Sequence, residues 1–321
     1  MSANSSDAPL PATPMSGPRR VCPKCSADNE ITERSSLWPA GWRCPTCGFE
    51  HAERNGFVQL APDLDDVDEG FDLASYDRLG DIEDDHFWFT TRNEMIAWLV
   101  RRFAAQASQA LEIGCGTGYV LFALRKALPS ARLSGSELHS LGLVHARQRH
   151  SQAVELFQMD ARHSGLSDVL DLVGAFDVLE HIADDRRVLE EIYRMLKPGG
   201  VLIATVPQHP WLWSRSDEVA HHQRRYTVGE LANKARHAGF GIPYQSSFAA
   251  LTLPLMAVSR LRSRLSNRGD STESLDMETK VSPRLNAALR QCLRGEQMLR
   301  RLGLPLPLGG SQVVVAVKPR S

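Results

Sequence analysis

From about residue 86 onward, apolar residues recur in two alternating patterns. Short apolar runs typical of buried strands occupy residues 110–114, 131–137, 154–160, 171–179 and 201–207. Between them lie segments with helical periodicity at residues 119–128, 141–150 and 184–197. This alternation predicts an α/β fold with a doubly wound, Rossmann-like and mostly parallel sheet. Ligands of such folds bind outside the carboxyl ends of the strands.

The first predicted strand runs into the glycine-rich stretch LEIGCGTGYV at residues 111–120. A dinucleotide site would favour G-x-G-x-x-G, and a P-loop would need Gly-Lys-Ser/Thr after the turn, so neither phosphate-binding pattern fits well. Glu112 precedes the turn, and Glu137 ends the next strand. A carboxylate at that second position can accept both hydrogen bonds of a ribose diol.

These segments resemble the class I S-adenosylmethionine-dependent methyltransferases. The motifs that carry the resemblance are LEIGCGTG, SGSELH, FQMDA, AFDVLEHI and LKPGG, in the order typical of the family. The resemblance covers residues 86–321 and implies a seven-stranded sheet, with S-adenosylmethionine as cofactor. Within it, residues from about 241 to 310 are expected to form a substrate-side insertion.

The resemblance also implies roles for individual residues. It places Glu112 near the methionine amino group, Glu137 on the ribose hydroxyls and Asp160 beside the adenine amino group. The remaining expected cofactor-binding residues are Gly114, Gly116, Gly118 and Asp177. For each acidic residue, a strand-end cap is the alternative interpretation.

The acceptor side is expected in the connections after the fourth and fifth strands. His181 follows the fourth strand and titrates in a useful range, so it is a candidate base or a pocket-shaping residue. Residues 207–231 are rich in His, Trp and Arg, and resemble a recurring stretch of one methyltransferase subgroup. The catalytic candidates are His181, His222, Arg225 and Tyr226. Tyr226 has an alternative role as a hydrophobic staple beside the capping box of Thr227 and Glu230.

A separate cysteine pattern precedes this domain. CPKC at 22–25 and CPTCG at 44–48 have the spacing of a zinc ribbon, which we expect at residues 21–58. The expected ligands of the Zn²⁺ ion are Cys22, Cys25, Cys44 and Cys47. Four thiolates close the coordination shell, so the predicted zinc is structural. Trp38 and Trp42 are expected to form a small core or a docking surface rather than a base-stacking platform.

Composition and charge limit the possible partners, the ordered part of the chain and the cellular location. The 321 residues carry 37 basic and 38 acidic side chains, and a formal charge of -1 disfavours nucleic acid as a partner. Residues 1–20 are expected to be a disordered tail without the features of a secretion signal, and the acidic stretch 59–85 a solvated linker. The cysteine usage favours a reducing cytoplasm. The apolar run at 248–258 is too short to span a bilayer, which leaves a buried element or a peripheral membrane contact.

Three functions are compatible with these features. The first is a methyltransferase acting on a small molecule, such as a lipid-linked, quinone-like or glycan-related acceptor, with sugar C-methylation as one variant. The second is an RNA methyltransferase whose ribbon presents the RNA. The third is a regulatory protein that binds S-adenosylmethionine without turnover.

Overall fold

The structure is a computed structural model that describes residues 17–32, 35–65, 75–150, 153–265, 281–304 and 306–320. Most of the predicted tail therefore lies outside the described residues, as do residues 266–280 of the predicted substrate-side insertion. The predicted tail nevertheless extends too far, because Arg19 and Arg20 belong to an ordered strand, β1 (Arg19–Val21).

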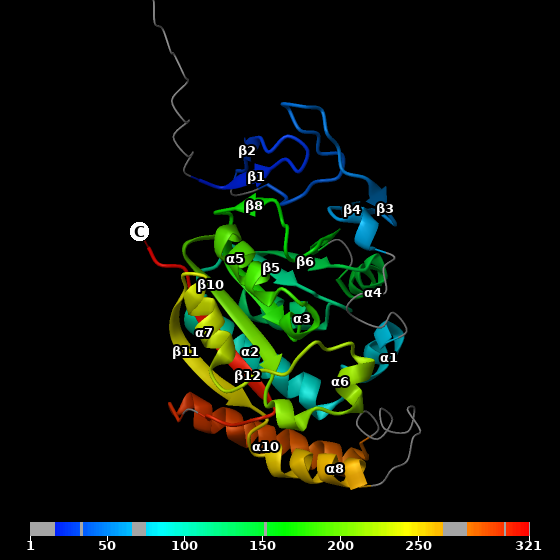
Figure 1. Cartoon of the computed structure of the whole chain (residues 1–321), viewed down its shortest axis with the longest axis vertical. Coiled ribbons are helices and arrows are strands. Elements are labelled where there is room, and N and C mark those ends of the chain that lie inside the picture. The colour runs from blue at the N-terminus through cyan, green and yellow to red at the C-terminus, as the bar shows by residue number, and fades with distance from the viewer. Residues whose placement is uncertain are drawn as a thin grey trace, which may run out of the picture.

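A nine-stranded sheet forms the centre of the molecule (Figure 1). Its order is β11-β12-β10-β9-β5-β6-β7-β4-β3. All pairs from β10 to β4 are parallel, whereas β12 pairs antiparallel with both β10 and β11. The strands are β3 (Glu53–Arg54), β4 (Phe57–Gln59), β5 (Gln109–Ile113), β6 (Arg132–Glu137), β7 (Glu155–Gln158), β9 (Leu170–Phe176), β10 (Leu196–Pro207), β11 (Gly241–Phe248) and β12 (Ser311–Val317). The predicted Rossmann-like fold is confirmed, and seven of the strands come from residues 86–321.

Helices cover both faces of the sheet and bury two apolar cores. One core lies between the sheet and α5 (Asp185–Met195) with α7 (Glu230–His237). The other lies under α2 (Phe87–Phe103), α3 (Tyr119–Ala127) and α4 (Ser140–His150). The helices α8 (Leu253–Leu265) and α10 (Pro283–Arg301) both lie at the end of the molecule opposite β1 (Figure 1).

The cysteine-rich segment is joined to the main domain through backbone pairing. β1 pairs with β2 (Asp28–Glu30) on one side and with β8 (Leu166–Ser167) of the main domain on the other. The β3–β4 hairpin extends the large sheet, because β4 pairs in parallel with β7. Trp38 is 3% exposed and belongs to the core of the main domain. This burial fits a docking role and leaves its ring unavailable for stacking on bases.

The interpretation of residues 59–85 as a solvated linker is wrong for three side chains. Asp65, Tyr76 and Glu83 are at most 5% exposed. The two carboxylates tolerate burial because each accepts hydrogen bonds, Asp65 from the Ser140 amide at 2.6 Å and Glu83 from Thr117 at 2.5 Å. The short helix α1 (Ser75–Ile82) is thereby held against the main domain.

The apolar run at 248–258 divides into two parts. Phe248 and Ala249 are buried at the end of β11, as a buried element requires. Leu255 and Val258 on α8 are 53% and 46% exposed, so the first of the two alternatives, a buried element, does not hold for the helix. Among the described residues, no helix combines the length and apolarity needed to cross a bilayer.

Glu155 on β7 anchors the cysteine-rich segment to the sheet. Its carboxylate accepts hydrogen bonds from the backbone amides of Leu37 at 2.9 Å and Trp38 at 2.8 Å. We expect Glu155→Ala to lower the free energy of unfolding by about 3 kcal/mol, since two buried amides would lose a charged acceptor. Urea denaturation measures the change.

The matched control is Glu190→Ala, which removes a carboxylate of the same kind from the surface of α5, where the side chain is 58% exposed. It should change the free energy of unfolding by at most about 0.5 kcal/mol. Equal effects of the two substitutions would contradict the anchoring role of Glu155.

Candidate functional site

The glycine-rich turn connects β5 to α3 at the carboxyl edge of the sheet. Gly114, Gly116 and Gly118 have φ values of 63°, 51° and 79°. A Cβ on Gly114 would lie 2.6 Å from a methyl carbon of Val178, and one on Gly118 would lie 3.0 Å from Ala146. A Cβ on Gly116 would meet nothing closer than the Tyr76 ring at 3.9 Å. Two of the glycines therefore permit close packing, and the third leaves space beside bare backbone.

Glu137 lies next to this space at the end of β6. One carboxylate oxygen accepts the Gly116 amide at 2.9 Å, and the other accepts the Leu138 amide at 2.7 Å. Burial raises the pKa of Glu137, while these backbone hydrogen bonds act in the opposite direction. Each oxygen retains a further lone pair, so the carboxylate can also accept the two hydroxyls of a diol.

Glu112 on β5 carries a buried carboxylate that is only partly satisfied. The residue is 2% exposed, and its Oε2 atom has no hydrogen-bond partner within the described part of the chain. Burial raises the pKa of Glu112 well above its ordinary value, against the opposing charge of Arg92. A buried acceptor without a partner is costly, so an ammonium group arriving here would be stabilised. This environment suits the amino end of S-adenosylmethionine.

Asp160 and Asp177 follow β7 and β9, and both are already paired. The Asp160 carboxylate accepts the amide and the Nε–H of Arg162, each at 2.9 Å. Burial alone would raise the pKa of Asp160, but these bonds outweigh it and the pKa is lowered. Asp177, at a φ of 58°, forms an ion pair with Arg92 of α2.

Sequence reasoning missed Arg92. Its guanidinium lies over the Trp88 ring at 4.5 Å and pairs with Asp177. The available signal was an arginine three residues after the aromatic run HFWF at 86–89, in the segment that forms α2. Nothing in the linear sequence showed that this helix packs against the carboxylates of the sheet edge.

Tyr76 was also missed, because it falls in the acidic stretch read as a linker. It is 1% exposed and lies against the turn, close to Gly116 and Gly142. Burial, followed by the nearby charge of Glu137, raises the pKa of its hydroxyl well above the ordinary value. Helix α1 therefore packs over the glycine-rich turn.

A second cluster lies in the connections that follow β9 and β10. The Nδ1 atom of His222 lies 2.8 Å from Asp217 Oδ1, and the Arg225 Nε–H donates to the same oxygen at 2.7 Å. Burial would raise the pKa of Asp217, but the hydrogen bond from His222 and the charge of Arg225 bring it down to about 2. An ionised carboxylate only accepts, so Nδ1 of His222 carries a proton, and in the neutral ring Nε2 presents the lone pair.

His181 and Glu180 complete this cluster. The rings of His181 and His222 meet edge to face, with centroids 4.7 Å apart. Glu180 is fully buried, and neither of its carboxylate oxygens has a hydrogen-bond partner in the described ranges. Burial, and then the charge of Asp177, raises the pKa of Glu180 well above its ordinary value.

Tyr226 stands apart from the histidine pair. It is fully buried, and its hydroxyl donates to Asp185 of α5 at 2.6 Å. Thr227 next to it donates through its amide and its hydroxyl to Glu230, at 3.0 Å in each case. The structure therefore brings together His181, His222 and Arg225, whereas the Tyr226 hydroxyl joins α5 to the start of α7.

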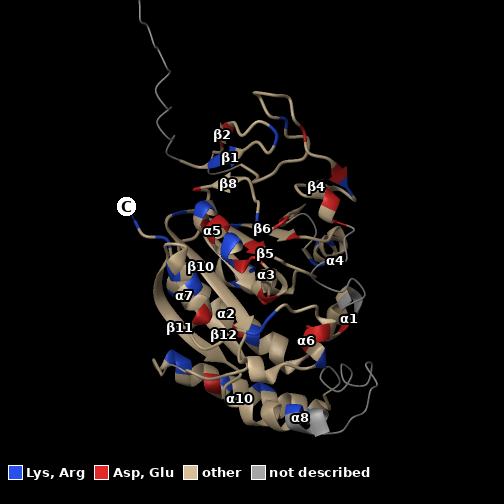
Figure 2. Cartoon of the chain, in the orientation of Figure 1, with Lys and Arg blue, Asp and Glu red and all other residues tan. Residues whose placement is uncertain are grey.

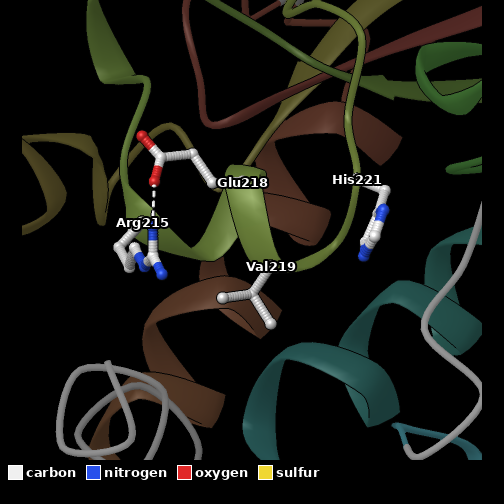
Figure 3. A pocket seen from close by; sticks show the side chains of 4 residues that line it. All are labelled: Arg215, Glu218, Val219 and His221. Carbon is white, nitrogen blue, oxygen red and sulfur yellow. Dashed lines mark hydrogen bonds and ion pairs between the residues drawn. The ribbon is translucent and has the colours of Figure 1, made fainter. Parts of the chain in front are cut away.

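A pocket of about 280 Å³ lies beside this cluster, on α6 (Arg215–Val219) and the turn that follows it (Figure 3). Arg215 and Glu218 form an ion pair on one side of it, and Val219 and His221 lie on the other. Asp217 of the same helix is 1% exposed, whereas His221 is exposed. The two neighbouring histidines, His221 and His222, thus have different surroundings.

The four cysteines of the N-terminal segment meet as predicted. The Sγ atoms of Cys22 and Cys47 are 3.7 Å apart, and those of Cys25 and Cys44 are 3.8 Å apart. Four thiolates around a tetrahedral Zn²⁺ ion would lie about 3.8 Å from each other. The cluster therefore has the geometry of a closed, four-coordinate metal site.

Residues 111–202 match the family model of the methyltransferase domain. Together with the sheet order and the glycine-rich turn, this match identifies a class I S-adenosylmethionine-dependent methyltransferase domain within the chain. The family implies S-adenosylmethionine as the cofactor.

The chain is similar to several curated methyltransferases. A probable S-adenosylmethionine-dependent methyltransferase of Mycolicibacterium smegmatis is 26% identical over 169 residues, which cover 50% of this chain and 62% of the relative. The trans-aconitate 2-methyltransferase of Azoarcus is 35% identical over 41% of this chain and 49% of its own length. The ubiquinone biosynthesis O-methyltransferase of Pseudomonas putida is 29% identical over 36% of this chain and 51% of its own. The chain thus spans about half the length of the curated relatives it matches.

A solved structure supports the fold. It is a chain from the complex between the Haloferax volcanii Trm112 methyltransferase activator and the putative methyltransferase. The TM-score is 0.53 at 20% identity, and the match covers 78% of this chain and 98% of the other.

Two ligands distinguish the roles of Glu112 and Glu137, the two carboxylates beside the turn. We expect Glu112→Gln to weaken binding of S-adenosylhomocysteine by about 1.5–3 kcal/mol, roughly 10- to 150-fold, since an ammonium would lose its charged acceptor. Binding of adenosine, which lacks the amino acid part, should not change. Glu137→Gln should weaken both ligands, because the new amide also faces two backbone donors. Isothermal calorimetry measures the four affinities.

Thermal unfolding of the ligand-free Glu112→Gln protein is the control for folding. Removing a buried carboxylate with an unpartnered oxygen should leave its midpoint unchanged or higher. Equal losses of adenosine and S-adenosylhomocysteine in this variant would contradict the assignment of Glu112 to the amino group.

Proposed function

We propose that the protein transfers a methyl group from S-adenosylmethionine to an oxygen-bearing small molecule. The observation that carries this proposal is the junction of the two clusters. Val178 packs against Gly114 of the turn and lies two residues before Glu180, so the cofactor side and the histidine side share one edge of the sheet. A methyl donor bound along the turn would therefore face the histidine pair.

The cofactor supplies the reactive methyl group on its positively charged sulfur when it is bound. The chain's own residues then have to hold the donor, orient the acceptor and exclude water. Glu112 and Glu137 serve the first task in this proposal, and Asp160 is assigned to the adenine side. His181 and His222 serve the second, with His222 held in one tautomer by Asp217.

The acceptor class is inferred from the relatives and from the charge. By its name, one relative methylates trans-aconitate, and another is an O-methyltransferase of ubiquinone biosynthesis. Both names indicate small-molecule acceptors. Figure 2 shows basic and acidic residues interspersed along α5 and α7, whereas α10 carries five arginines and one glutamate. Two of these arginines are paired, Arg294 with Glu94 and Arg300 with Glu296. Nucleic acid needs a concentrated basic surface, and the formal charge of -1 over the whole chain disfavours an RNA substrate. The finer proposal is a hydroxyl or carboxylate on a quinone-like, lipid-linked or glycan-related molecule.

We further propose that Cys22, Cys25, Cys44 and Cys47 bind a structural Zn²⁺ ion. The segment they hold is too small to bury a core alone, so metal binding would supply much of its folding free energy. Its role in this proposal is to extend the large sheet through β4, which pairs with β7, and to hold β8 of the main domain through β1.

Incubation of the protein with methyl-labelled S-adenosylmethionine and a cell extract tests the proposed function. After fractionation, the label should enter the small-molecule or lipid fraction and resist ribonuclease. His222→Ala should reduce labelling at least 100-fold, as expected for a residue that contacts the acceptor. Its affinity for S-adenosylhomocysteine should stay within about twofold, since the cofactor contacts are elsewhere.

His221→Ala is the matched control and should label as the native protein does. Label that ribonuclease releases would show that the acceptor is RNA and not a small molecule. Binding of S-adenosylhomocysteine without any labelled fraction would favour a regulatory protein that does not turn over.

A further inference from the structure

We infer that Glu180, His181 and His222 form a binding site for one divalent transition-metal ion, separate from the four cysteines. The inference rests on the proposed function only in what the ion would do. One carboxylate oxygen of Glu180 and one ring nitrogen of each histidine all lie within 4.8 Å of one another. Around a single ion such atoms would be about 3.4 Å apart, which small side-chain rotations can reach.

The donor set suits a transition metal. Two imidazoles and one carboxylate bind divalent first-row ions and leave coordination positions open. A structural site such as that of the four cysteines has no open coordination position. The open positions would point toward the acceptor side of the domain.

Charge and hydrogen bonding at Glu180 supply an independent reason for a cation. The side chain is fully buried, and both of its oxygens lack a hydrogen-bond partner among the described residues. The nearby positive charges are committed elsewhere, Arg92 to Asp177 and Arg225 to Asp217. With Glu180 ionised, three carboxylates face two guanidinium groups, which leaves one negative charge uncompensated. A buried ion of this kind is stable only with a paired cation.

Asp217 provides the outer support that metal-binding histidines usually have. Its carboxylate accepts the Nδ1–H of His222 at 2.8 Å, which directs the Nε2 lone pair away from Asp217. Carboxylate–histidine–metal arrangements of this type fix the ring and raise the basicity of the bound nitrogen. Asp217 is thus a positioning residue, itself held by Arg225.

In the proposed reaction, the ion would bind the acceptor oxygen. A bound hydroxyl loses its proton to solvent more readily because the metal lowers its pKa. The resulting oxygen anion attacks the methyl carbon, the carbon–sulfur bond breaks, and its electron pair returns to sulfur. The products are the methylated oxygen and neutral S-adenosylhomocysteine. The site therefore favours acceptors with one or two oxygens that can bind a metal.

Titration with Mn²⁺ of protein loaded with one equivalent of Zn²⁺, which the four thiolates bind first, tests the site without using activity. Thiolates favour Zn²⁺ over Mn²⁺, so Mn²⁺ should leave the cysteine site undisturbed. Electron paramagnetic resonance of free Mn²⁺ should show one saturable site. His222→Ala and Glu180→Gln should abolish it, and Asp217→Asn should weaken it about 10- to 100-fold. His221→Ala should bind Mn²⁺ as the native protein does.

Two outcomes would overturn the metal site: the absence of saturable Mn²⁺ binding up to millimolar concentration, or equal binding by native protein and His222→Ala. Affinity for S-adenosylhomocysteine, measured on the same samples, shows that each variant remains folded. If that affinity persists while Mn²⁺ fails to bind, the metal site is wrong and the proposed methyl transfer stands. If Mn²⁺ binds but no fraction of the extract accepts the methyl group, the metal site stands and the proposed methyl transfer is wrong.

Discussion

The arrangement of the site follows from two buried and two half-buried carboxylates that lie at one edge of a parallel sheet. Glu112, Glu137, Asp177 and Glu180 come from β5, β6 and the connection after β9, and the sheet brings them together in a region of low dielectric. Each buried negative charge needs a donor or a cation. Backbone amides donate to Glu137, and Arg92 pairs with Asp177. Within the described part of the chain, one oxygen of Glu112 and both oxygens of Glu180 have no hydrogen-bond partner. Those two positions are where positively charged ligands would be stabilised most.

The cysteine-rich segment is part of the same construction. Its hairpin extends the sheet next to β7, and Glu155 of that strand binds its backbone. The chain that leaves the hairpin passes Asp65, which accepts the Ser140 amide just beyond Glu137. The segment thus holds in place the loop that follows Glu137, the predicted ribose-binding carboxylate. This connection gives the segment a structural role on the cofactor side of the domain.

The fold was predictable because the alternation of buried strands and amphipathic helices is a local property of the sequence. The glycine-rich turn and the cysteine pairs were predictable for the same reason, since their residue spacing is fixed by short-range geometry. The residues missed, Arg92, Tyr76 and Asp65, act through contacts with distant parts of the chain. From the sequence alone, an acidic stretch is interpreted as solvent-exposed. The hydrogen-bond partners that allow its carboxylates to be buried lie far away in the sequence.

The sequence by itself determined the Rossmann-like class, the glycine-rich turn with Glu137 at the end of the following strand, and the four-cysteine cluster. Only the tertiary structure decided that Glu180 is buried beside His181 and His222 without a hydrogen-bond partner among the described residues. It also decided that the Tyr226 hydroxyl donates to Asp185 and does not join the histidines. The physical reason is that periodicity fixes which face of an element is buried. The burial and pairing of a polar side chain depend on which distant groups the packed elements bring against it.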